Sequence, residues 1–148
     1  MGPRNRATRR TKKAAYQQVA PPLVLDSGAV IALARGDVRV SGFLSLALDE
    51  GAKVFVPAVA VAETVRGRGP RDAAVNRVVA AIDAVLTTDE ASARTAGALL
   101  GASRSRSTID ALVVATAIHA AGARILTSDE QDLRRLSEGQ EGLTIHAV

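Results

Sequence analysis

The stretch that decides the fold is PPLVLDSGAVIALARGD, residues 21–37. Residues 23–25 are apolar without interruption, which predicts a short buried strand, and Asp26 follows directly. Small apolar residues then continue in a pattern that predicts a helix over about residues 28–35. A carboxylate therefore stands where a buried strand passes into a helix, and its role needs an explanation.

The alternation of strand and helix patterns continues to the end of the chain. Strands that are apolar throughout and are separated by helices indicate a parallel sheet covered by helices on both faces. We therefore expect one α/β domain over residues 21–148, with no internal repeat. The predicted strands are 22–25, 53–56, 83–86, 124–127 and 143–147, and the predicted helices are 28–35, 38–50, 58–66, 71–81, 89–101, 109–121 and 130–136.

Composition limits the chemistry. Apolar residues make up 47% of the 148 residues and aromatic residues only 2%, so Ala, Val and Leu must form the core. The chain has no cysteine, which excludes disulfides and thiolate metal sites and leaves oxygen ligands or the two histidines for any metal. No run approaches the roughly 18 apolar residues of a membrane span, and Pro21, Pro22 and Asp26 interrupt a secretory signal. We expect a cytoplasmic protein with no membrane partner.

The net charge of +4 is unevenly distributed. Residues 1–13 contain six of the 19 basic residues and no acidic one, which leaves 13 basic and 15 acidic residues in the remainder, a net charge of −2. The high isoelectric point is therefore a property of the N-terminal segment. We expect residues 1–20 to be a disordered basic extension, which either is only solvated or adds sequence-independent attraction to nucleic acid.

Four acidic residues are expected at one end of the sheet. Asp26 follows the first predicted strand, Glu63 lies on the helix after the second, Asp110 opens the long helix TIDALVVATAIHAAG, and Asp129 follows the fourth strand. The carboxyl ends of parallel strands form the crevice in which such folds bind ligands. Four carboxylates gathered there would repel one another unless a cation neutralised them, so the arrangement predicts Mg²⁺ or Mn²⁺.

Each acid also has a purely structural explanation. Asp26 and Asp129 could cap helices, because Asp at a helix start accepts backbone N–H bonds. Asp110 stands three residues after Ser107, the spacing of a capping box, and Glu63 could be an ordinary solvated helix residue. The set of four favours a metal site over four separate structural roles.

The blocks LVLDSGAVIALARGD, VPAVAVAETVRG and TIDALVVATAIHAAGARILTSDEQDL, in this order, resemble the PIN domain, and specifically the VapC-type toxin ribonucleases of toxin–antitoxin systems. The resemblance covers about residues 22–147. It implies a three-layer α/β/α fold with a central parallel sheet of order 3-2-1-4-5. It also implies an RNA substrate, a cognate antitoxin protein and a homodimer.

The resemblance assigns roles to individual positions. Two departures from the family are mild: Gly28 stands where Ser or Ala is commoner, and the family does not require the basic extension. Ser27 stands where the family more often has Thr. The implied metal-binding and catalytic residues are Asp26, Glu63, Asp110 and Asp129, and the implied site-ordering residues are Ser27, Thr127 and Ser128.

Hard-ion coordination would supply the chemistry. One or two Mg²⁺ ions held by carboxylates would lower the pKa of a bound water and stabilise charge on the leaving 3′-oxygen, so that no His or Lys base is required. His119 lies nine residues after Asp110 on one helix, and nine steps of about 100° place it on the opposite face. His146, in the last strand, gives no better case.

Substrate contacts are expected from arginines. Two basic pairs, one after Glu63 and one before Asp110, could border the acidic site and contact phosphates, although solvated loop arginines are an equal alternative. With one Tyr and two Phe, stacking on bases can contribute little. The candidate RNA-binding residues are Arg66, Arg68, Arg104 and Arg106.

Other classes fit less well. A phosphoacceptor receiver domain needs an Asp closing its third strand and a Lys near its fifth. Here the third predicted strand ends in VLTTDE, and the last strand has no Lys. A haloacid-dehalogenase-type phosphatase needs an Asp at position 28, which is a glycine in this chain. The strongest rival is a non-catalytic PIN-like module that binds RNA or an antitoxin. The complete set of four acids favours the nuclease.

Overall fold

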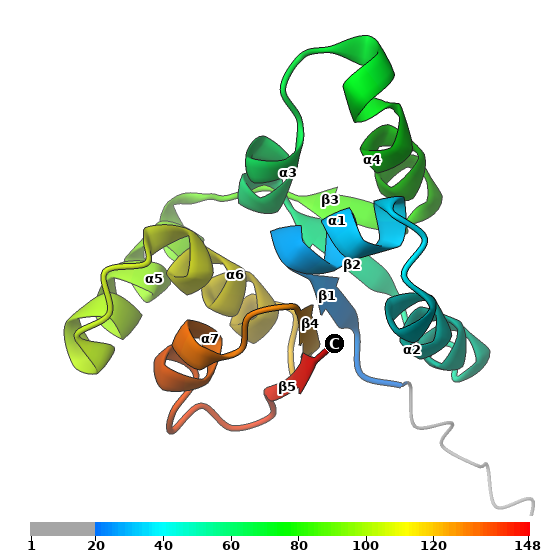
Figure 1. The fold of residues 1–148 in the computed structure, drawn as a ribbon. Coiled ribbons are helices and arrows are strands. Elements are labelled where there is room, and N and C mark those ends of the chain that lie inside the picture. Colours follow the sequence, from blue (N-terminus) through cyan, green and yellow to red (C-terminus); the bar gives the residue numbers. More distant parts are fainter. Residues whose placement is uncertain (1–19) are drawn as a thin grey trace, which may run out of the picture.

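The computed structural model describes residues 20–148, which form a five-stranded sheet with all strands parallel, in the order β3-β2-β1-β4-β5. The strand β1 occupies the centre, and its neighbours are aligned so that Leu23 pairs with both Val54 and Arg124 (Figure 1). The parallel sheet predicted from the sequence pattern and the strand order implied by the family resemblance are both confirmed. The strands are β1 (Leu23–Leu25), β2 (Val54–Pro57), β3 (Ala84–Leu86), β4 (Arg124–Thr127) and β5 (Thr144–Ala147).

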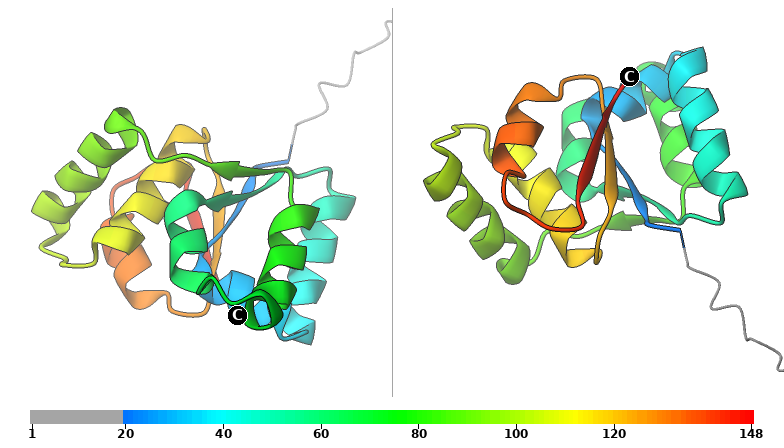
Figure 2. Two further views of the ribbon diagram at one scale, coloured as in Figure 1. Left: turned by 90° about the horizontal axis from the view of Figure 1, so that it is seen from above. Right: turned by 90° about the horizontal axis from the view of Figure 1, so that it is seen from below.

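Helices cover both faces of the sheet. Figure 2 shows α1, α2 and α4 on one side and α5, α6 and α7 on the other. The short helix α3 contacts both α1 and α6, near the end of the sheet at which β2 terminates. The helices are α1 (Ser27–Ala34), α2 (Val38–Asp49), α3 (Ala58–Thr64), α4 (Gly69–Ala81), α5 (Glu90–Ser103), α6 (Thr108–His119) and α7 (Gln131–Leu136).

The central strand divides its side chains between two apolar cores. Leu23 and Leu25 pack in the core that includes α1, α2 and α4, whereas Val24 packs in the core that includes α5, α6 and α7. Successive side chains of a strand point to opposite faces, so a strand buried on both sides must be apolar at every position. This explains why the run LVL is uninterrupted and why all three residues have no exposed surface.

The predicted helices and strands all appear, and their ends differ from the prediction by at most two residues. β2 extends to Pro57, and α4 begins at Gly69 because Pro70 fits the first turn of a helix, where no N–H donor is needed. Residues 1–19, nearly all of the predicted basic extension, lie outside the described residues. Among the described residues, no helix is long and apolar enough to cross a membrane.

Candidate active site

The four predicted acids line one pocket of about 500 Å³ at the carboxyl end of the sheet. They come from four separate segments: the start of α1, the helix α3, the first turn of α6 and the turn after β4. The parallel sheet brings them together, since β1, β2 and β4 all end on this side. The lining residues are Asp26, Ser27, Gly28, Glu63, Arg106, Ser107, Thr108, Ile109, Asp110, Ser128 and Asp129.

Asp26 is the most enclosed of these acids, with 7% of its surface exposed. Its Oδ1 accepts a hydrogen bond of 2.8 Å from the backbone N–H of Ala29, so it caps α1 as the sequence allowed. Burial raises the pKa of Asp26 to about 6, and the nearby charges of Asp110 and Glu63 act in the same direction, against the hydroxyl of Thr127 and the cap bond. Capping occupies one carboxylate oxygen, so a second role for Asp26 is compatible with it.

Asp110 is half-buried in the first turn of α6. Ser107 caps this helix by accepting from the Asp110 backbone N–H, and its hydroxyl donates to Asp110 Oδ2. The return bond of a capping box is not formed, because the Ser107 backbone N–H donates to Ser105 Oγ instead. Burial raises the pKa of Asp110, the Ser107 bond opposes this, and the charge of Asp132 raises it further. Asp132, in the first turn of α7, is thus near enough to act on Asp110, although it does not line the pocket. The sequence carried a signal for it, because it lies three residues after Asp129.

Glu63 and Asp129 are exposed at the rim. The turn that carries Asp129 is fixed by Thr127, which is fully buried at the end of β4. The Thr127 hydroxyl accepts from the Asp129 backbone N–H and donates to the Asp129 carbonyl, both at 2.9 Å. These bonds hold the Asp129 turn to the end of β4, and the site-ordering role that the family resemblance implies for Thr127 stays a prediction.

Gly28 allows two segments to approach closely beside Asp26. A Cβ at position 28 would lie 2.0 Å from the Ser128 Oγ and 3.1 Å from its Cβ. Glycine therefore lets the turn after β4 reach the start of α1. The sequence showed Gly28 only as a departure from the family pattern, because nothing local indicates which segment faces it.

The donor set suits a hard divalent cation, because carboxylate oxygens are the ligands that Mg²⁺ prefers. Neighbouring negative charges help to raise the pKa of Asp26 and of Asp110, so a cation placed among these carboxylates would be favoured. Within residues 20–148, however, no three His, Asp or Glu side chains are arranged to hold an ion directly. The four acids share a pocket, and binding one ion through three of them would require side-chain rearrangement or bridging waters.

The other candidate residues are distributed around the site. Arg106 lines the acidic pocket. Arg66 lines a neighbouring pocket, which shares Glu63 with the acidic one, whereas Arg68 and Arg104 line neither.

Neither histidine lies at the acidic pocket. His119 is exposed and hydrogen-bonds Thr95 Oγ1 at 2.9 Å. The ring of His146 packs on Phe43, with 4.8 Å between ring centroids.

Comparison with known proteins agrees with this geometry. The model of the PIN domain family matches residues 23–139, which include all four acids. The chain belongs to the PIN domain family. No curated protein sequence matches it.

Several solved structures share this PIN fold. A chain in the structure of VapBC2 from Rickettsia felis bound to a DNA fragment from their promoter is 12% identical, with a TM-score of 0.69 and coverage of 85% of this chain and 98% of that one. DNA-bound VapBC from Salmonella typhimurium has 12% identity, a TM-score of 0.64 and coverage of 86% and 98%. VapBC-5 from Mycobacterium tuberculosis has 20% identity, a TM-score of 0.54 and coverage of 86% and 100%. At sequence identities of 12% to 20%, the similarity to these structures establishes the fold and nothing further.

Proposed function

We propose that this PIN domain is a Mg²⁺-dependent endoribonuclease, with Mn²⁺ as an alternative ion, and that it is the toxin of a toxin–antitoxin pair. The observation that carries the proposal is the convergence of four carboxylates on one pocket. None of the ion pairs within residues 20–148 includes any of the four acids, and Arg106 is the one basic residue among the lining of their pocket. A bound divalent ion would neutralise the four acids.

The acidic residues would share the work. Bound among them, the ion would acidify a water and stabilise charge on the leaving 3′-oxygen of a phosphodiester. Asp26 is held by the Ala29 N–H and presents its other oxygen as a ligand, with Glu63, Asp110 and Asp129 as the further ligands. Thr127 holds the Asp129 turn, and Ser27 and Ser128 border the pocket as polar groups.

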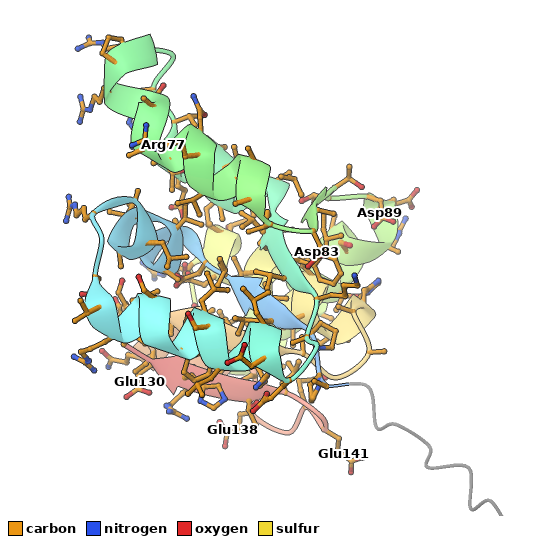
Figure 3. All side chains as sticks on the ribbon, turned by 90° about the vertical axis from the view of Figure 1, so that its right-hand side faces the viewer. Arg77, Asp83, Asp89, Glu130, Glu138 and Glu141 are labelled. Atoms are coloured by element: carbon orange, nitrogen blue, oxygen red, sulfur yellow. The ribbon has the colours of Figure 1, made fainter. Side chains whose placement is uncertain are left out.

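An antitoxin partner would have a surface to bind. An apolar groove of about 480 Å³ runs between α1, α2 and α4, and Leu33, Leu48 and Val78 are among its lining residues. Leu48 is 51% exposed, which leaves apolar surface for a partner helix. Arg77 on α4 and Asp83, before β3, supply polar groups at this groove (Figure 3). We expect an amphipathic antitoxin helix here, with an Arg or Lys of the same partner reaching the acidic pocket.

Cleavage of RNA by the full chain tests the proposal. We expect Mg²⁺-dependent cleavage that leaves 5′-phosphate and 3′-hydroxyl ends, and loss of this activity in Asp26→Asn, which keeps capping ability and removes one charge. Asp49→Asn, at the exposed end of α2, is the matched control and should cleave normally. Cleavage that persists in EDTA with cyclic-phosphate ends would refute the metal mechanism.

The rival function is RNA or antitoxin binding without catalysis. It gains some support from the spacing of the acids, which do not meet around one ion as they stand. Binding of RNA with no cleavage in Mg²⁺ or Mn²⁺ would favour the rival. The homodimer implied by the family resemblance is a separate prediction, which the mass of the purified protein by light scattering would test.

A further inference from the structure

A second polar pocket adjoins the acidic one. It has a volume of about 310 Å³ and is walled by α1, α3 and α4, and Glu63 lines both pockets. Three arginines from separate segments line it: Arg35 at the end of α1, Arg66 in the loop after α3, and Arg71 in the first turn of α4. All three are exposed. The two pockets therefore form a continuous polar surface with acids at one side and guanidinium groups at the other.

The balance of charge in this second pocket favours an anion. Three arginines face Glu63 and Asp72, so the lining carries a net charge of +1. Asp72 is directed to the backbone: its two oxygens accept hydrogen bonds of 3.0 Å from the Arg66 N–H, and one of them accepts from the Arg68 N–H at 3.0 Å. The side chain of Asp72 is thus engaged by the loop, and the guanidinium groups have no such carboxylate partner among the ion pairs of residues 20–148.

Asp72 also fixes the loop that carries Arg66. It is 5% exposed, and its backbone N–H donates to the Arg68 carbonyl at 2.9 Å, which closes the loop from the other side. The hydrogen bonds from the loop N–H groups, that of Arg66 foremost, lower the pKa of Asp72 and keep it ionised. Gly67, between the two arginines, has a φ of +70°, a conformation that favours glycine. The Arg66 guanidinium donates to the Val65 carbonyl at 2.9 Å.

We propose that this arginine pocket binds the phosphodiester backbone of the RNA substrate beside the cleavage site, with Arg35, Arg66 and Arg71 as phosphate ligands and Asp72 as the positioning residue of the Arg66 loop. The inference rests on the proposed nuclease function, because it assigns the path of the same substrate. Arginine presents a planar fork of N–H donors that matches phosphate oxygens, and such contacts fix the register of a strand without reading its sequence. Glu63 marks the point at which the strand passes from one pocket to the other.

The test is RNA binding by the full chain as a function of salt. An Asp26→Asn background prevents cleavage, and a fluorescein-labelled single-stranded RNA oligonucleotide in Mg²⁺ is the probe. Each phosphate contact contributes about 0.7 to the slope of log affinity against log salt for a single strand. We therefore expect the double variant Arg35→Ala/Arg71→Ala to bind several-fold more weakly and to lower that slope by about 1 to 1.5.

Arg135→Ala is the control. Arg135 is an exposed arginine of α7 that lines neither polar pocket and not the apolar groove, so its loss should leave the salt slope unchanged. Residues 1–13 are present in all of these proteins, so their contribution to binding is the same in each. A double variant indistinguishable from Arg135→Ala would overturn the inference. If the double variant binds RNA normally and loses affinity only for a co-purified protein partner, the pocket serves the partner and the RNA assignment is wrong.

Asp72→Asn separates positioning from catalysis. An amide cannot accept from all the loop N–H groups, so the Arg66 loop should loosen and KM for RNA should rise several-fold at unchanged kcat. A lower kcat at unchanged KM would contradict the positioning role. Failure of this inference leaves cleavage by the wild-type chain intact, whereas failure of the proposed function shows as no cleavage by the wild type itself.

Discussion

Asp26→Asn should make the metal-free protein more stable at neutral pH. Folding buries the Asp26 carboxyl and raises its pKa from 3.8 to about 6. The folded state therefore prefers the protonated acid, and ionising it costs folding free energy. Asn is neutral at every pH and caps a helix about as well as Asp, so the substitution removes this cost while it keeps the bond to Ala29.

The sign and size of this stability difference follow from the linkage between proton binding and folding. Below about pH 3.8 both the folded and the unfolded protein hold the proton, and wild type and variant should be equally stable. Between pH 3.8 and about 6 the folded state binds more protons, so the free energy of unfolding of the wild type falls relative to the variant as pH rises. A shift of roughly two units corresponds to about 3 kcal/mol, which should be the full difference above pH 6.

Urea unfolding in EDTA at a series of pH values measures this difference. Asp49→Asn removes an exposed carboxylate and is the control, for which we expect no such gain. Adding Mg²⁺ at pH 8 should then stabilise the wild type by about 2.7 kcal/mol at one hundred times its Kd, and Asp26→Asn by much less. If Asp26→Asn is no more stable than wild type at pH 8 in EDTA, the burial argument is refuted. Equal stabilisation of both proteins by Mg²⁺ would remove Asp26 from the ligands.

Three further predictions concern the surroundings of the site. Gly28→Ala should lower stability by about 1–3 kcal/mol, because its Cβ would meet the Ser128 hydroxyl at 2.0 Å, and adding Ser128→Ala should recover most of the loss in urea unfolding. Leu48→Glu should prevent assembly with a co-expressed antitoxin, measured by co-purification. Leu46→Glu, which is also on α2 but does not line the groove, should leave assembly intact. A structure of the complex with no antitoxin Arg or Lys near the four acids would contradict the expected binding mode. Deleting residues 1–13 should leave unfolding cooperative and weaken RNA binding mainly at low salt.

Much of the fold could be predicted from the sequence. The pattern of apolar residues depends only on neighbours in the sequence, so the run LVL at 23–25 was sufficient to predict a strand buried on both faces. The position of Asp26 directly after this strand, with Asp129 after another, placed two acids at one edge, because parallel strands all end on the same side. Glu63 and Asp110 joined the set from their positions on the neighbouring predicted helices, and the family resemblance then supplied the sheet order.

The tertiary structure decided which distant side chains meet. Arg35 and Arg71 share a pocket with Arg66 because α1 and α4 pack side by side, and no local pattern marks that contact. The approach of Ser128 to Gly28 likewise depends on how the turn after β4 meets the start of α1. Spacing along the chain fixes the direction of a side chain relative to its own helix or strand, whereas the distance between two elements depends on the packing of every residue between them.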